Sequence, residues 1–261
     1  MSQRWMQSLA RASARFILLL VGMSIFIIPT QAQSPEPVST TVQGMALIYN
    51  GPPSCTGCAE AMGAIAEKVG LKPMYVANPS EIPGLLTQAA VFVIGGTDDD
   101  LKPFEAFTPD IIKAIQEYIA TGGRYWGICG GGYIAADLLF DKTGAPIRTF
   151  KIIPVEADDY SKTYEPRLEK IRWREQDRQM FFKAGPKFAL TDKNTPVEIF
   201  GWYSDGSIAA LQSAYGKGKV AISGPHPEAP RDWYDGTGWT SLEELAVGML
   251  QDLLSDKPIQ R

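Results

Sequence analysis

Short apolar runs alternate with amphipathic segments along the first half of the chain. The apolar runs predict β-strands at residues 45–49, 72–76, 89–94 and 124–128. The run "AAVFVI" at 89–94 is apolar throughout, which is typical of a parallel strand that is buried on both faces. Between the runs, apolar residues recur three and four positions apart, the spacing of a helix that buries one face. This alternation predicts a parallel sheet with helices on both faces.

Local signals mark where the helices begin and end. Residues 59–69 show helical spacing of apolar residues. A second helix should begin after Thr108, whose hydroxyl is a good N-cap, with Pro109 at its first position. A glycine pair ends that helix, and a third helix should start at Gly130 after the strand at 124–128.

The pattern changes after about residue 142, where strand-like segments follow one another without helices between them. These segments cover residues 147–155, 171–173, 180–183, 197–202, 208–213 and 220–223. The turns "SDGS" and "YGKGK" favour hairpins, so this half should add antiparallel strands to one edge of the sheet. An amphipathic helix at 239–254 closes the chain. The expected fold class is α/β: a doubly wound, mostly parallel sheet with added antiparallel strands in the C-terminal half.

The first 32 residues have the pattern of a signal peptide. Three arginines without an acidic residue precede an apolar run at 16–28, which Pro29 interrupts. We expect cleavage after Ala32 and export to the periplasm or the extracellular space; an uncleaved N-terminal anchor is the alternative. Residues 33–43 are rich in Pro, Ser and Thr and predict a flexible tether. Residues 44–258 should then form a single domain.

The balance of charge argues against some classes of partner. The chain has a net charge of −4, which becomes −7 when the predicted signal peptide with its three arginines is removed. This argues against nucleic acid or an anionic membrane as the main partner. The run Asp98-Asp99-Asp100 is interpreted as a solvated acidic loop rather than a cation site. We expect a small-molecule or peptide substrate, and neither a metal nor a cofactor.

Three cysteines occur in a chain that we expect to enter an oxidising compartment. Cys55 and Cys58 are close enough in sequence to pair, which leaves Cys129 as an unpaired thiol. A structural disulfide between Cys55 and Cys58 is the first interpretation; free thiols and a redox-active pair are the alternatives. The pair lies in a loop that should reach the same edge of the sheet as Cys129.

Cys129 lies in "GICGG", between a predicted strand and a predicted helix. A residue on such a sharp turn has a strained conformation, needs small neighbours and projects at the carboxyl end of the sheet. The start of the helix favours the thiolate form of a cysteine there. The N–H group of Gly130 then points to the place where an oxyanion would form. We interpret this stretch as a nucleophile elbow; the alternative is a glycine-rich turn around a buried thiol.

The only histidine of the chain, His226, stands in "SGPHPE" after a predicted strand. Pro227 favours an extended conformation at His226, and residues i and i+2 of an extended chain point the same way. Glu228 is therefore placed to fix the tautomer of the imidazole and to stabilise its charged form. A structural histidine in a proline-rich loop is the alternative. Since the strands before Cys129 and His226 should end at one edge of the sheet, we expect the two side chains to meet.

These motifs together resemble a known superfamily. "GICGGG" followed by "HPE" is similar to the class I glutamine amidotransferases, which use a Cys-His-Glu triad on a doubly wound, flavodoxin-like sheet. With "ALIYNGPPS" and "VFVIGG", the motifs resemble the N-terminal domain of eukaryotic-type biotin–protein ligases and its standalone bacterial relatives. The resemblance implies Cys129 as nucleophile, His226 as base and Glu228 as the residue that orients His226. It also implies that the N–H groups of Gly96 and Gly130 bind the oxyanion.

The resemblance covers residues 44–228, and the sequence departs from the family pattern at one informative position. Glutamine amidotransferases usually carry Cys-x-Gly-x-Gln, but Tyr133 stands in place of the glutamine, so glutaminase activity is not expected. The chain does not show the glycine- and arginine-rich biotin/ATP loop of a ligase domain, so it should not itself ligate biotin. We expect Asn50, Gly95, Tyr133 and Trp233 to line the pocket, with core packing as the alternative for the aromatic residues.

Three hypotheses about function follow from these motifs. The first is a cysteine hydrolase or transferase that acts on a C–N or acyl bond through a thioester at Cys129. The second is a non-catalytic module on the same fold that binds a small molecule or a peptide. The third is a redox protein that uses the pair Cys55 and Cys58.

Overall fold

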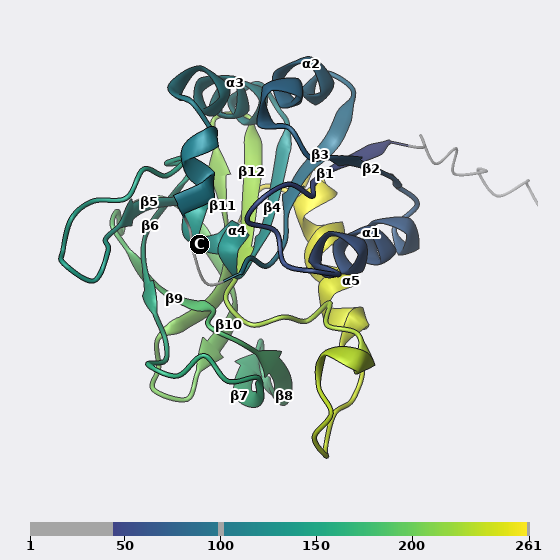
Figure 1. The fold of residues 1–261 in the computed structure, drawn as a ribbon, viewed down its shortest axis with the longest axis vertical. Helices are drawn as coiled ribbons and strands as arrows, with labels where there is room; N and C mark the ends of the chain where they lie inside the picture. The colour runs from purple at the N-terminus through teal and green to yellow at the C-terminus, as the bar shows by residue number, and fades with distance from the viewer. Residues whose placement is uncertain (1–43, 99–101, 260–261) are drawn as a thin grey trace, which may run out of the picture. The chain divides into compact units, whose positions relative to one another are not determined.

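A computed structural model describes residues 44–98 and 102–259 of the chain. The predicted signal peptide at 1–32, the predicted tether at 33–43, and Asp99 and Asp100 of the acidic run lie outside the described residues. Within the described residues the chain forms one 12-stranded sheet, in which a parallel part continues into an antiparallel part (Figure 1).

The parallel part of the sheet is built by the strands that the apolar runs predict. In spatial order they are β2 (Lys72–Val76), β1 (Met45–Tyr49), β3 (Ala89–Ile94), β4 (Arg124–Ile128) and β12 (Gly218–Ser223). Every neighbouring pair among them is parallel. Ile94 of β3 and Ile222 of β12 both pair with Gly127 of β4. The carboxyl ends of these three strands therefore lie side by side, and Gly96, Cys129 and His226 follow directly after them.

Helices cover both faces of the parallel part (Figure 1). They are α1 (Cys58–Lys68), α2 (Ile82–Leu86), α3 (Pro109–Ala120), α4 (Gly130–Ala135) and α5 (Glu243–Leu254), with short 3-10 turns at Pro79–Glu81, Lys102–Ala106 and Arg231–Trp233. Residues of α1 and α5 pack with Ile48 and Trp126 on one face, whereas residues of α2 and α3 pack with Leu47 and Phe92 on the other. Neighbouring strand residues point to opposite faces, so strands covered on both sides are apolar throughout.

The helix α3 shows how the sequence sets these elements. The hydroxyl of Thr108 accepts a hydrogen bond from the N–H of Ile111 (3.4 Å), and Pro109 follows Thr108 at the first helical position. Ile115 and Ile119, one helical turn apart, are fully buried against the sheet. Capping and apolar spacing therefore specify the same helix. No helix among the described residues is both long and apolar enough to cross a membrane.

The second half of the chain extends the same sheet beyond β12. Along the main path it adds β11 (Ile208–Tyr215), β10 (Val197–Tyr203), β7 (Arg167–Trp173) and β8 (Gln176–Phe182), and each neighbouring pair is antiparallel. A branch made of β5 (Ala136–Leu139), β6 (Ile153–Asp159) and β9 (Pro186–Leu190) pairs with β11 through β9. The expected α/β class, with antiparallel strands added to one edge of a parallel sheet, is confirmed.

Three details of the chain from Gly130 onward differ from the sequence-based expectation. The strand predicted at 147–155 begins only at Ile153, because the backbone before it is bound to α4: the N–H groups of Phe150 and Ile152 donate to the carbonyl oxygens of Ile134 and Ala135. The helix predicted from Gly130 is short, since β5 follows it directly. The sequence pattern does not indicate β5 or β9, which are strands of 4 and 5 residues.

Candidate active site

Cys129 lies at the turn between β4 and α4, with φ 52° and ψ −107°. A positive φ is uncommon for a residue with a Cβ atom and persists only where surrounding contacts hold it. The N–H of Cys129 donates to the carbonyl oxygen of Ser223 at the end of β12 (2.7 Å). The N–H groups of Gly132 and Tyr133 donate to the carbonyl oxygen of Cys129 (2.9 and 3.0 Å). This turn has the strained backbone of a nucleophile elbow.

The glycines two positions before and after Cys129 are required by the close approach of the backbone. A Cβ atom on Gly127 would lie 2.5 Å from the carbonyl oxygen of Gly131. A Cβ atom on Gly131 would lie 2.1 Å from the carbonyl oxygen of Ile94 in β3. Neither contact is tolerated by a real side chain, so the turn packs backbone against backbone. The small neighbours that the elbow needs are therefore present in "GICGG" for a steric reason.

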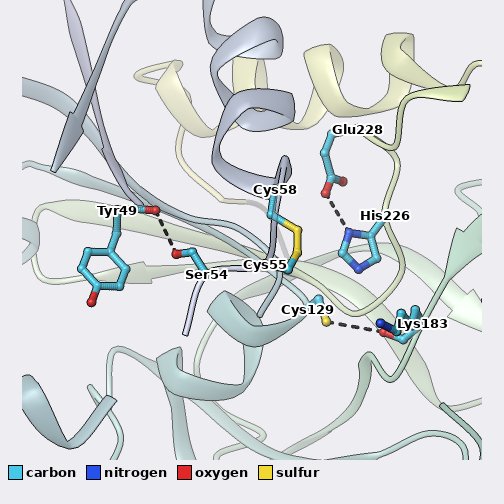
Figure 2. The surroundings of a disulfide bond; sticks show 8 residues. All are labelled: Tyr49, Ser54, Cys55, Cys58, Cys129, Lys183, His226 and Glu228. Atoms are coloured by element: carbon cyan, nitrogen blue, oxygen red, sulfur yellow. Dashed lines mark hydrogen bonds and ion pairs between the residues drawn. A yellow bond between two sulfur atoms is a disulfide. The ribbon is translucent and has the colours of Figure 1, made fainter. Parts of the chain in front are cut away.

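His226 follows β12 and is held in place from the antiparallel half of the sheet. Its N–H donates to the carbonyl oxygen of Phe181 in β8 (2.9 Å), and the residue is only 4% exposed. Its Nδ1 lies 2.8 Å from Oε1 of Glu228, whose carboxylate is buried beside the ring (Figure 2). The expected contact between His226 and Glu228 is therefore present, but a turn makes it and not an extended chain: the N–H of Ala229 donates to the carbonyl oxygen of His226 (3.3 Å). Since Glu228 occupies Nδ1, the other ring nitrogen, Nε2, is left to serve a reacting group.

The environment of His226 favours its protonated form. Burial by itself lowers the pKa of a histidine, because it disfavours the imidazolium. The negative charge of Glu228, its hydrogen bond to the ring and the influence of nearby Cys129 outweigh burial and raise the pKa of His226 to about 10. At neutral pH the site therefore holds an imidazolium ion next to the sulfur of Cys129.

Cys129 is unpaired and nearly buried. The residue is 5% exposed, and its Sγ donates a weak hydrogen bond to the carbonyl oxygen of Lys183 at 3.6 Å (Figure 2). His226 lines the same cavity as Cys129, and the electrostatic influence of Cys129 contributes to the raised pKa of the histidine. Cys129 follows β4, yet it contacts Lys183, which follows β8, and shares a cavity with His226, which follows β12.

A disulfide lies beside this pair of residues. Cys55 and Cys58, interpreted from the sequence as a structural pair, are joined with their Cα atoms 5.4 Å apart (Figure 2). A Cβ atom on Gly96 would lie 2.8 Å from Sγ of Cys58, 3.1 Å from Sγ of Cys55 and 3.0 Å from Cε1 of His226. Gly96 therefore separates the disulfide from the imidazole, and only a residue without a side chain fits between them.

A cavity of about 300 Å³ opens among these groups. Cys129, His226, Gly96 and both disulfide cysteines line it, together with Thr56, Thr97, Asp98 and Trp233 from the parallel-half loops and the C-terminal segment. Pro166, Phe181 and Lys183 complete its wall from the antiparallel half. The ring of Phe181 lies 5.6 Å from the rings of both His226 and Trp233, centroid to centroid. The cavity thus joins a polar reacting centre to an aromatic wall.

The two backbone groups expected to bind an oxyanion lie next to Cys129. Gly130 follows it in the chain, and Gly96 lines the same cavity. Among the hydrogen bonds between described residues, the N–H groups of Gly96 and Gly130 have no acceptor. Gly96 lines the cavity, whereas Gly130 is not among the lining residues. Within the described part of the chain, no three His, Cys, Asp or Glu side chains gather closely enough to hold a metal ion.

Of the residues expected to line the pocket, Trp233 does so, whereas Asn50, Gly95 and Tyr133 are not among the lining residues. The side-chain N–H of exposed Asn50 donates to Glu60 (3.3 Å), and the carbonyl oxygen of Gly95 accepts from the N–H of Gly131 (3.1 Å). The hydroxyl of Tyr133 donates to the carboxylate of Asp159 (2.6 Å). Burial and that carboxylate raise the pKa of Tyr133 far above its usual value. Tyr133 therefore joins α4 to β6 instead of facing the cavity.

The sequence pattern does not indicate which residues of the antiparallel half line the cavity. Phe181 lies within the strand expected at 180–183, but no motif indicates that its carbonyl oxygen binds His226. Lys183 contacts Cys129 through its carbonyl oxygen, which carries no sequence signature at all. Pro166 lies just before β7. Contacts made by the backbone depend on strand pairing, so the sequence of one strand does not reveal them.

Comparison with solved structures defines the class of fold. A glutamine amidotransferase superposes with a TM-score of 0.53 and 16% identity, over 71% of this chain and 91% of that chain. A glutamine amidotransferase from Thermotoga maritima superposes with a TM-score of 0.54 and 12% identity, over 81% of this chain and 98% of that chain. At these identities the likeness shows a shared fold, the class I glutamine amidotransferase-like α/β fold.

Comparison of sequences narrows the resemblance to one family. Residues 46–146 match the family model "Biotin-protein ligase, N terminal", which confirms the expected resemblance over the segment that carries Cys129. The biotin–protein ligase of Schizosaccharomyces pombe is 22% identical over 209 residues, which cover 70% of this chain and 33% of that protein. The chain thus spans about a third of the length of this curated relative. His226 and Glu228 lie beyond the segment that the family model matches.

Proposed function

We propose that this chain is an exported cysteine hydrolase or transferase, which acts on a C–N or acyl bond through a thioester at Cys129. One observation carries the proposal: on its strained turn, Cys129 lines the same cavity as His226, whose Nδ1 is 2.8 Å from the buried carboxylate of Glu228. A nucleophile, a proton-transfer group and an orienting carboxylate in this order are the parts that covalent acyl transfer requires.

The raised pKa of His226 defines the resting form of this site. In this structure the thiol of Cys129 donates to the carbonyl oxygen of Lys183, and in the proposed reactive form it has released its proton to solvent, leaving a thiolate beside the imidazolium of His226. The thiolate attacks the carbonyl carbon of the substrate, a C–S bond forms, and the carbonyl π electrons move onto oxygen. The free N–H groups of Gly96 and Gly130 bind that oxyanion. When the scissile bond breaks, the leaving group takes the proton from His226.

Release of the product reverses these roles. The neutral imidazole of His226 removes a proton from water, or from an acceptor hydroxyl or amine, as that group attacks the thioester carbon. Cys129 then leaves as a thiolate beside the imidazolium that has formed again. Glu228 keeps its hydrogen bond to Nδ1 throughout and so holds Nε2 towards the reacting atoms.

The cavity supports a small substrate with an apolar group. Its volume of about 300 Å³ and its wall of Phe181 and Trp233 fit a compact acyl or peptide side chain. The side chain at the family's glutamine position, Tyr133, is engaged with Asp159, so we do not propose glutaminase activity. The relative from Schizosaccharomyces pombe is named as a biotin–protein ligase, and this chain spans only 33% of its length. We therefore do not propose biotin ligation for this chain. Export is proposed from the signal-peptide pattern at 1–32.

Alkylation by iodoacetamide tests this function without knowledge of the substrate. Residue Cys129 should react readily at pH 6.5, where free thiols are slow, because His226 stabilises its thiolate. His226→Ala should slow alkylation by about tenfold or more at this pH. A burst of p-nitrophenol from p-nitrophenyl acetate, present in the wild type and absent in Cys129→Ser, would reveal the thioester step.

The rival function is a binding module on the same fold, which the 5% exposure of Cys129 favours. In that case Cys129 would alkylate slowly in the wild type and in His226→Ala alike, and neither protein would give a burst. Far-UV and near-UV circular dichroism of both proteins would establish that the substitutions leave the fold intact. The ratio of the alkylation rate of the wild type to that of His226→Ala therefore decides between the two functions.

A further inference from the structure

The disulfide between Cys55 and Cys58 plays no part in acyl transfer, although both cysteines line the same cavity as Cys129 and His226. The two sulfurs differ in their surroundings. Cys55 is partly exposed, whereas Cys58 is 1% exposed and is the first residue of α1, a helix of 11 residues. An external thiolate can therefore approach Cys55, while Cys58 is the sulfur placed to leave.

Positive charge surrounds the sulfur of Cys58. The N-terminal end of α1 carries a partial positive charge that stabilises a thiolate at its first residue. The ring of His226 faces the same sulfur across Gly96, where an added Cβ atom would contact Cys58 Sγ at 2.8 Å and His226 Cε1 at 3.0 Å. Because Glu228 holds His226 in its protonated form, a leaving thiolate has a counter-charge nearby.

We propose that Cys55 and Cys58 form a thiol–disulfide exchange site, which takes small thiols or cysteine-containing peptides through the cavity. The substrate thiolate attacks Sγ of Cys55, a substrate–Cys55 disulfide forms, and the Cys55–Cys58 bond breaks. The electron pair of that bond goes to Cys58, which leaves as a thiolate near the positive end of α1. A second substrate thiolate attacks the mixed disulfide, so the substrate leaves as a disulfide and Cys55 as a thiolate. Two substrate thiols are oxidised, the protein pair is reduced, and a small disulfide restores the pair by the reverse steps.

This activity does not involve Cys129, so the variant Cys129→Ser separates it from acyl transfer. The full-length variant, with the Cys55–Cys58 pair oxidised, is incubated with 2-mercaptoethanol under native conditions. The reaction is quenched with acid, the free thiols are alkylated with N-ethylmaleimide, and the products are analysed by mass spectrometry. We expect the pair to be reduced at least about tenfold faster in the folded protein than in the same protein unfolded in urea. A disulfide with a structural role only would show the opposite order, and this result would overturn the proposal.

Single-cysteine variants in the Cys129→Ser background test the assigned roles. The reduced variant Cys58→Ser, which keeps Cys55, should form a mixed disulfide with 2-hydroxyethyl disulfide at least about tenfold faster than Cys55→Ser, which keeps the buried Cys58. His226→Asn should slow reduction of the intact pair by about tenfold. The matched control Arg231→Gln removes an exposed positive charge from the same C-terminal segment and should leave the rate within about twofold. Equal rates for the two cysteines, or equal slowing by both substitutions, would overturn the assignment.

Discussion

The parallel and antiparallel halves of the sheet supply different parts of the candidate site. The parallel half supplies the reacting geometry: the strained turn at Cys129 after β4, and the close-packed loop at Gly96 after β3. The antiparallel half supplies the wall of the cavity and the carbonyl oxygens of Phe181 and Lys183. Strand β12, which pairs parallel with β4 and antiparallel with β11, precedes His226 and joins the two contributions.

This difference follows from how the two kinds of sheet are built. Neighbouring parallel strands all end at one edge, so the residues that follow them converge whatever the lengths of the connections. Antiparallel strands alternate in direction, so their contribution depends on register and on the turns between them. The chemistry of the site therefore resides in the half with fixed geometry, and its shape resides in the half that varies more freely.

Glu228→Gln should give the largest effect, because Glu228 is the buried partner of His226 where the two halves meet. The pKa of His226 is about 10, above the usual 6.5, so the folded state keeps a proton that the unfolded state releases above pH 6.5. This stabilisation is full below pH 6.5 and is lost as pH rises through about 10. The variant should lose about 3–5 kcal/mol of unfolding free energy at pH 6.5, and less at pH 10.

Urea unfolding at both pH values measures this effect. Glu243→Gln is the matched control, since Glu243 pairs with Lys68 at 2.6 Å on the surface, and should cost at most about 1 kcal/mol. If the two substitutions lower the free energy of unfolding by the same amount, the buried ion pair between Glu228 and His226 does not stabilise the fold.

Gly131→Ala should give the next largest effect, because it tests the close packing of the parallel half. The added Cβ would lie 2.1 Å from the carbonyl oxygen of Ile94, so the start of α4 must move, at a cost of about 3 kcal/mol. Gly248→Ala in α5, where nothing lies within 4 Å, should instead stabilise the protein by about 0.5–1 kcal/mol. Thermal unfolding of both variants measures these changes, and a shift of the same sign in both would contradict the steric account of the elbow.

Tyr133→Phe tests the junction between α4 and the antiparallel branch. The hydroxyl of this buried tyrosine donates to the carboxylate of exposed Asp159 at 2.6 Å, and loss of this hydrogen bond should cost about 1–2 kcal/mol in urea unfolding. Tyr164 donates to the same carboxylate from the surface at 3.3 Å, so Tyr164→Phe should cost less than about 0.5 kcal/mol. We also expect that Tyr133→Gln does not produce glutaminase activity, because this position is not among those that line the cavity.

Phe181→Leu should give the smallest change in stability and tests the wall that the antiparallel half provides. The substitution keeps an apolar side chain, so the unfolding free energy should fall by about 1 kcal/mol. The aromatic contact with Trp233 is lost, so the KM for p-nitrophenyl acetate should rise severalfold while the burst amplitude stays unchanged. Phe140→Leu, at a residue that is 44% exposed, should change neither quantity. A fall in burst amplitude with unchanged KM would assign Phe181 to the reacting geometry instead.

The sequence predicts the parallel half well, because local signals and tertiary structure agree there. The all-apolar run of β3 and the capped start of α3 each specify one structure. The antiparallel half is predicted less well: β6 begins at Ile153 instead of residue 147, and β5 and β9 carry no recognisable pattern. Short strands acquire their structure from their neighbours, so a single sequence indicates them poorly.

By itself, the sequence predicted the strand-to-helix turn around Cys129, the contact between His226 and Glu228, and parallel strands that bring Cys129 and His226 to one edge of the sheet. These follow from glycine spacing, from the short separation of His226 and Glu228, and from the convergence of parallel strands, all of which are local or topological properties. The tertiary structure alone decided that Phe181 and Lys183 contact the site through their carbonyl oxygens, and that Tyr133 does not line the cavity. It also placed the Cys55–Cys58 disulfide across Gly96 from the imidazole, because that contact depends on how two separate loops pack, which no short stretch of sequence encodes.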